Sequence, residues 1–123
     1  MAVSEKSHYL SNSKTEDYVA FPVEGILEGE PNVRVHWLRD SGSGEGMMLA
    51  ALQRADPSRL EYVFPGDETF LLLKGEIDIE LTETGETVTV RAGDIASFPK
   101  GAKSIWNIKS MMEKFVVVCA DPS

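Results

Sequence analysis

The chain has 123 residues, of which 42% are hydrophobic, and 20 acidic against 12 basic side chains give a formal net charge of −8. This length and composition fit one folded domain with its own core and exclude an intrinsically disordered chain. The acidic charge disfavours binding to nucleic acid and to anionic membranes, because both present negative surfaces.

No membrane-spanning or secretory segment is visible in the sequence. The longest apolar run, residues 115–120, is far shorter than the ~20 residues that a transmembrane helix needs. The first ten residues lack the apolar centre of a signal peptide, so we expect a cytoplasmic protein. The single cysteine, Cys119, cannot form an internal disulfide, and its apolar neighbours predict a small buried side chain in a strand.

The first part of the chain predicts an arm followed by strands. Residues 1–18 are polar and are expected to form an N-terminal arm, while residues 19–123 form a single barrel domain. Residues 33–38 alternate, with Val33, Val35 and Trp37 on one face and Arg34, His36 and Leu38 on the other. After the glycine-rich loop at residues 40–46, residues 47–54 are expected to form a strand, with a short helix as the alternative.

The remainder of the chain continues as short strands with glycine or proline turns. Strands are predicted at residues 60–64, 69–73, 77–81, 87–90, 95–98, 104–108 and 114–120. Strands that recur about every 8 to 12 residues are typical of an all-β sandwich or barrel. An open strand edge in such a fold favours a homodimer or a covering N-terminal arm.

Two segments resemble the conserved motifs of the cupin superfamily. In residues 68–76 Glu68 is followed seven residues later by Gly75, as at the end of the first cupin motif. In residues 93–101 the order Gly, five residues, Pro, any residue, Gly resembles the second motif. The resemblance covers about residues 33–119 and implies an RmlC-like jelly-roll barrel (a double-stranded β-helix), a small-molecule site inside the barrel and frequent homodimers.

A finer resemblance points to one subfamily. Residues 62–68 (YVFPGDE), residues 98–101 (FPKG) and the following Trp106 are similar to the ureidoglycine-aminohydrolase-like single-domain cupins. Those relatives depend on a metal.

The metal ligands of cupins are largely missing here. The positions that carry histidine in metal-binding cupins hold Tyr62, Phe64 and Ser104, and only Glu68 remains. Because a first-row metal needs three or four ligands, one carboxylate does not hold it, and we expect neither a metal nor another cofactor. Whether His36 helps to rebuild a metal site with Glu68 stays open, although a histidine on the strand surface is the more common case.

Strand alternation and the resemblance together predict an inward-facing pocket around Glu68. Its expected substrate-binding residues are Tyr62, Phe64, Glu68, Phe70, Ser104 and Trp106. Glu68 and Tyr62 are the candidate catalytic residues; Glu68 is either a general base or a structural acid paired with Arg59, Lys103 or Lys114. For Trp106 and Phe70 plain core packing is the favoured interpretation, because aromatic side chains fill barrels with or without a ligand.

Three functions therefore stay open from the sequence. The first is a metal-free cupin that binds a small molecule as a sensor or carrier. The second is a small-metabolite lyase, isomerase or hydrolase that uses Glu68 and Tyr62 for acid–base chemistry. The third is a structural or interaction barrel that is filled by its own side chains.

Overall fold

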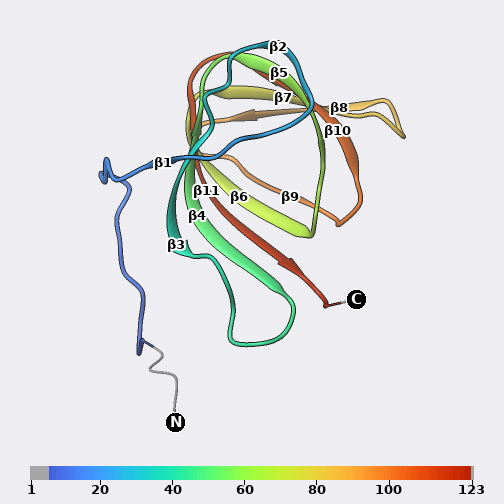
Figure 1. Ribbon diagram of the computed structural model, residues 1–123. Helices are drawn as coiled ribbons and strands as arrows, with labels where there is room; N and C mark the ends of the chain where they lie inside the picture. The colour runs from blue at the N-terminus through green and yellow to red at the C-terminus, as the bar shows by residue number, and fades with distance from the viewer. Residues whose placement is uncertain (1–5, 123) are drawn as a thin grey trace.

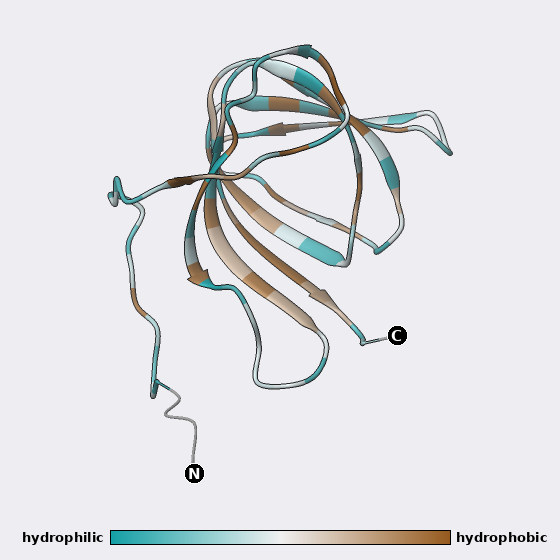
Figure 2. Ribbon diagram, viewed as in Figure 1, coloured by the Kyte–Doolittle hydropathy of each residue, from teal (hydrophilic) through white to brown (hydrophobic). Residues whose placement is uncertain are grey.

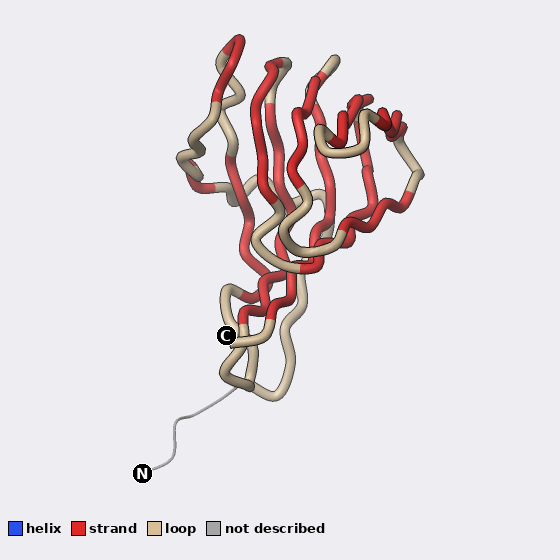
Figure 3. Tube along the Cα trace, turned by 90° about the vertical axis from the view of Figure 1, so that its right-hand side faces the viewer, coloured by secondary structure: helices blue, strands red, loops and turns tan. Residues whose placement is uncertain are grey.

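The computed structural model describes residues 6–122, and within them the chain forms eleven strands and no helix (Figures 1 and 3). The strands build two antiparallel sheets, as expected for a jelly roll. Because the described part of the chain is all strand and loop, it contains no helix long and apolar enough to cross a membrane. Residues 1–5 of the expected arm lie outside the described residues.

The six-stranded sheet has the order β1-β3-β4-β11-β6-β9. Its strands are β1 (Val19–Ala20), β3 (Arg34–Arg39), β4 (Met47–Ala55), β6 (Asp67–Lys74), β9 (Ile95–Phe98) and β11 (Met112–Ala120). The long strands β4 and β11 pair from Met47 opposite Ala120 to Ala55 opposite Met112. This continuous ladder excludes the short helix that was the alternative for residues 47–54.

The five-stranded sheet has the order β2-β5-β10-β7-β8. Its strands are β2 (Ile26–Gly29), β5 (Ser58–Val63), β7 (Glu76–Leu81), β8 (Glu86–Arg91) and β10 (Lys103–Ile108). The core lies between the two sheets, because each strand turns alternate side chains toward the other sheet. Apolar residues appear as brown stretches on the strands in Figure 2, and side chains such as Phe70, Leu72, Ile79 and Trp106 are almost fully buried.

The N-terminal segment docks onto the edge of the six-stranded sheet. Val19 of β1 pairs with Val35 of β3, which covers the edge of β3 at this point. The ring of His36 hydrogen-bonds to Ser11 Oγ at 2.8 Å and to the carbonyl oxygen of Asp17 at 2.8 Å. The pairing residues 19–20 lie just beyond the arm expected at residues 1–18, whose described part contacts β3 through Ser11 and Asp17.

Cys119 corrects one expectation. The sequence predicted a buried cysteine, but its side chain is exposed. In β11 the side chains of Val116 and Val118 point inward and are at most 9% exposed. The period of two therefore places Cys119 on the outer face, and an apolar run does not by itself mean that both faces are covered.

Steric constraints explain why glycine occupies position 75 at the end of the first motif. Gly75 has a φ of +92°, and a Cβ built there would lie 2.6 Å from the carbonyl oxygen of Met111. Only glycine allows both this backbone conformation and this close approach. Gly101 of the second motif also has a positive φ, +87°, but open space surrounds it.

Candidate functional site

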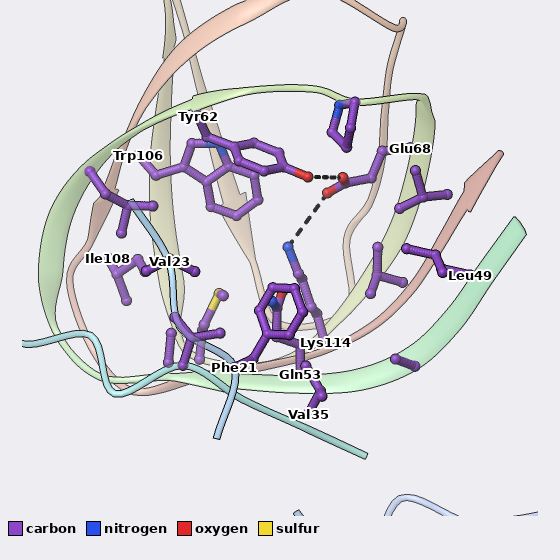
Figure 4. Close-up of a pocket in the computed structure, with 18 of the residues that line it drawn as sticks. Phe21, Val23, Val35, Leu49, Gln53, Tyr62, Glu68, Trp106, Ile108 and Lys114 are labelled. Atoms are coloured by element: carbon purple, nitrogen blue, oxygen red, sulfur yellow. Dashed lines mark hydrogen bonds and ion pairs between the residues drawn. The ribbon is translucent and has the colours of Figure 1, made fainter. Parts of the chain in front are cut away.

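A cavity of about 200 Å³ lies between the two sheets. Its walls are mainly apolar and include Val35 and Trp37 of β3, Leu60 of β5, and Ile108 and Val116 of β10 and β11. The segment between β1 and β2 adds Phe21 and Val23 (Figure 4). The cavity approaches the surface beside Phe21 and Pro65, which line it and are themselves exposed.

Three polar side chains meet inside these apolar walls (Figure 4). Tyr62 comes from β5, Glu68 from β6 and Lys114 from β11. Tyr62 donates a hydrogen bond from its hydroxyl to Glu68 Oε1 at 2.6 Å, and Lys114 Nζ lies 3.6 Å from Glu68 Oε2. The two charged side chains are buried, with exposed fractions of 1% for Glu68 and 3% for Lys114. We call these three residues the polar triad.

The tyrosine of the triad is held as a hydrogen-bond donor. Burial raises the pKa of Tyr62, and the negative charge and hydrogen bond of Glu68 raise it further. Tyr62 therefore keeps its proton and fixes one oxygen of the carboxylate. The other oxygen is left to face Lys114.

The ammonium group of Lys114 lies 3.6 Å from the carboxylate that it faces, which is farther than ordinary hydrogen-bond distance. The same group lies over two aromatic faces, 4.2 Å from the ring centroid of Trp106 and 4.6 Å from that of Phe70. Burial lowers the pKa of Lys114, and the carboxylate of Glu68 opposes this shift in part.

Ser104 holds the aromatic wall of the site in place. Ser104 donates a hydrogen bond to the carbonyl oxygen of Tyr62 at 2.7 Å and accepts one from Trp106 Nε1 at 3.1 Å. This satisfies the indole N–H in a buried position and fixes the orientation of the ring. Trp106 then presents its face to Lys114 and lies nearly perpendicular to Tyr62, with 5.8 Å between the Trp106 and Tyr62 ring centroids.

The six predicted binding residues fall into two groups in the structure. Tyr62, Glu68 and Trp106 line the cavity. Phe64, Phe70 and Ser104 are buried but are not among its lining residues. The rings of Phe64 and Phe70 instead stack on Phe98, with centroid distances of 4.7 and 6.3 Å.

The sequence did not identify Lys114 as a cavity residue, although it named Lys114 among three possible partners of Glu68. A signal was present, because Lys114 lies two and four residues before the inward-facing Val116 and Val118. Of the other two candidates, Arg59 lies 3.9 Å from Glu28 and Lys103 is exposed. Gln53, directly opposite Lys114 on β4, also lines the cavity and was not predicted.

The donor set of the cavity does not fit a metal ion. Glu68 is the only carboxylate among the described residues that line it, and it already faces Tyr62 and Lys114. His36 is held by the N-terminal segment and is not a lining residue, whereas its neighbours Val35 and Trp37 are. Over residues 6–122 no group of three or more His, Cys, Asp or Glu side chains is placed to hold a metal.

The chemistry of the site follows from this arrangement. The walls favour an apolar molecule, and the buried ammonium faces a carboxylate oxygen that is 3.6 Å away, so it can donate hydrogen bonds to a ligand. The neighbouring carboxylate can exchange a proton with that ammonium. The site can therefore bind a polar atom of a small apolar molecule and can move one proton beside it.

Several solved structures share the fold. They include a putative ethanolamine utilization protein Q from Salmonella typhimurium LT2, with 24% identity, a TM-score of 0.59 and coverage of 71% of this chain and 68% of that chain. The EutQ protein of Clostridium difficile has 17% identity, a TM-score of 0.60 and coverage of 76% and 71%, respectively. An acetylacetone dioxygenase from Acinetobacter johnsonii has 18% identity, a TM-score of 0.67 and coverage of 96% and 80%. At these identities the likeness shows the fold alone.

The sequence comparisons decide the family. No curated protein matches the chain. Neither the solved structures nor the sequence matches show that the chain belongs to the ureidoglycine-aminohydrolase-like subfamily of cupins. Residues 42–115 do match the sequence model of the EutQ-like cupin domain, and the chain therefore belongs to this family of cupins.

Proposed function

We propose that this cupin binds a small, mainly apolar molecule that carries one hydrogen-bond acceptor. The observation that carries the proposal is the buried ammonium of Lys114, which lines the cavity with its one anionic partner 3.6 Å away. A buried charged donor without good acceptors is costly, so an acceptor on a bound molecule is favourable there. An open cavity beside this group favours ligand binding over a barrel filled by its own side chains.

The size of the cavity limits the ligand. An apolar protein cavity of about 150 Å³ holds benzene, and this cavity measures about 200 Å³. The expected ligand is therefore a molecule of about one ring. The polar triad already contains one positive and one negative charge, so a neutral ligand adds no unpaired charge to the buried site.

Acid–base catalysis on the bound molecule is the second candidate function. Glu68 is the better supported base, because it lines the cavity beside a proton donor, whereas the raised pKa of Tyr62 keeps that hydroxyl protonated. Membership of the ureidoglycine-aminohydrolase-like subfamily is a further proposal that rests on the motif residues alone. It does not extend to that subfamily's metal-dependent reaction, because the described residues that line the cavity do not supply a set of metal ligands.

A thermal shift experiment with cyclohexanone tests the binding proposal. A ligand present at tenfold excess over its Kd stabilises the folded state by about 1.4 kcal/mol, which raises the melting temperature by a few degrees. We expect this rise with cyclohexanone and a smaller one with methylcyclohexane, which has a similar shape but no acceptor.

The matched control is Ala51→Met. Ala51 is buried and lines the cavity, so the longer side chain fills the space that the ligand needs while leaving the polar triad unchanged. Cyclohexanone should not stabilise this variant. Equal shifts in both proteins, or no shift in the natural sequence at saturating probe, would contradict the proposal.

A further inference from the structure

Lys114 is unusual because its charged side chain is almost fully buried. It lies on the inner face of β11, is 3% exposed and points its amine at Glu68 inside an apolar cavity (Figure 4). An ammonium in water makes three hydrogen bonds, but here the carboxylate oxygen that it faces is 3.6 Å away and the group lies over two aromatic faces. Desolvation of this kind favours the neutral amine, which is the nucleophilic form of lysine.

Glu68 is positioned to accept the proton that the amine must lose. Its Oε1 is held by the Tyr62 hydroxyl at 2.6 Å, which leaves Oε2 as the oxygen that faces Nζ. Transfer of one proton from Nζ to Oε2 converts two buried charges into two neutral groups, so no unpaired charge is created.

We propose that Lys114 forms a reversible Schiff base with a small, neutral aldehyde or ketone bound in the cavity. This inference rests on the proposed binding function and names the class of ligand. The carbonyl group supplies the acceptor that the ammonium lacks, and the apolar walls accommodate the rest of the molecule. Lys114 is the only cationic side chain among the described residues that line the cavity, so no second cation is available to pair with a carboxylated carbonyl compound.

Lys114 and Glu68 can carry out every proton transfer of this reaction between themselves and the carbonyl compound. Glu68 takes a proton from the Lys114 ammonium, and the amine lone pair forms a bond to the carbonyl carbon while the C=O π pair moves to oxygen. Glu68 gives its proton to that oxygen and takes one from the new C–N nitrogen. It returns this proton to the hydroxyl, the C–O bond breaks, and water leaves. The product is a protonated imine beside an ionised Glu68, so the charge of the site is unchanged and nothing is oxidised or reduced.

Reductive trapping in the full chain tests the proposal. The protein is incubated with benzaldehyde and sodium cyanoborohydride, and the benzylated lysine is located by peptide mass mapping. We expect one benzyl group on Lys114, gained faster than on any exposed lysine such as Lys100 or Lys109. Pyruvate should give no preferential labelling of Lys114, because the described residues that line the cavity include no second cation for its carboxylate.

Two variants test whether the labelling of Lys114 depends on the cavity and on Glu68. Ala51→Met keeps Lys114 and Glu68 but fills the cavity, so it should lose the labelling of Lys114 and keep that of the exposed lysines. Glu68→Gln should slow labelling of Lys114 by ~10²-fold, since the group that carries protons to the carbonyl and hydroxyl oxygens is removed. Labelling of Lys114 no faster than of exposed lysines, or unchanged in Ala51→Met, would overturn the proposal.

The same samples distinguish the two proposals. Stabilisation of the natural protein by cyclohexanone without trapping at Lys114 would overturn the Schiff base and leave the binding function standing. Absence of both stabilisation and trapping would contradict both.

Discussion

Replacement of Lys114 by methionine perturbs the polar triad most directly. Methionine has a similar length and keeps the packing against Trp106, but it leaves Glu68, which is 1% exposed, with the Tyr62 hydroxyl as its remaining polar partner. Removal of one partner from a buried ion pair costs about 3–5 kcal/mol, because the other charge stays buried. A domain of this size has a total unfolding free energy of ~5–15 kcal/mol, so the loss is a large fraction of it.

Glu68→Gln should cost less than Lys114→Met. The ammonium that remains still lies over two aromatic faces, each worth ~2 kcal/mol in a desolvated site. The lowered pKa of Lys114 also allows the amine to become neutral. The double variant leaves no buried charge in the triad, so its stability should return to within about 1 kcal/mol of the natural protein.

Urea unfolding followed by circular dichroism and tryptophan fluorescence measures all four proteins. The predicted double-mutant cycle gives a coupling energy of at least about 2 kcal/mol between the two positions. If the two single losses add in the double variant to within ~0.5 kcal/mol, the residues do not act as a buried pair and the reasoning is refuted.

Three further predictions concern single contacts. Tyr62→Phe should lower the unfolding free energy by about 1.5–3 kcal/mol in urea unfolding, because a buried carboxylate loses its hydrogen bond; a loss below 0.5 kcal/mol would show that the bond contributes little. Gly75→Ala should be clearly more destabilising than Gly101→Ala, since both have positive φ but a Cβ meets a backbone carbonyl oxygen only at Gly75; equal losses would refute that steric explanation. Lys109→Gln should raise the pKa of Glu76 in an NMR titration, because the hydrogen bond and charge of Lys109 are the main causes of its lowered pKa. The stability that this pairing contributes is present above the ordinary pKa of 4.5 and is lost as the pH falls through the lower folded-state value, so the two proteins should converge in stability at acidic pH.

Much of the fold is encoded locally and was therefore predictable. The alternation at residues 33–38 gives the inward face directly, and Val35 and Trp37 of that face do line the cavity. The motif glycine Gly75 marks a turn whose steric demand is visible in the structure. Such signals depend on neighbours in sequence, so they survive without knowledge of the tertiary packing.

The site itself was only partly predictable. Alternation tells which side chains point inward, but not which of them border an open space, and Phe64 and Phe70 instead pack against Phe98. Lys114 is a charged residue that composition alone would place at the surface. Its burial is explained by Glu68 and by the two aromatic faces, which come from distant parts of the chain and meet only in the folded barrel.

A crystal structure of the protein soaked with cyclohexanone tests the central claim most directly. We expect a single ring inside the cavity between the two sheets, with its polar end against Lys114 Nζ and Trp106 at its side. A cavity closed by the surrounding side chains, or a ring bound only at the outer surface, would contradict it.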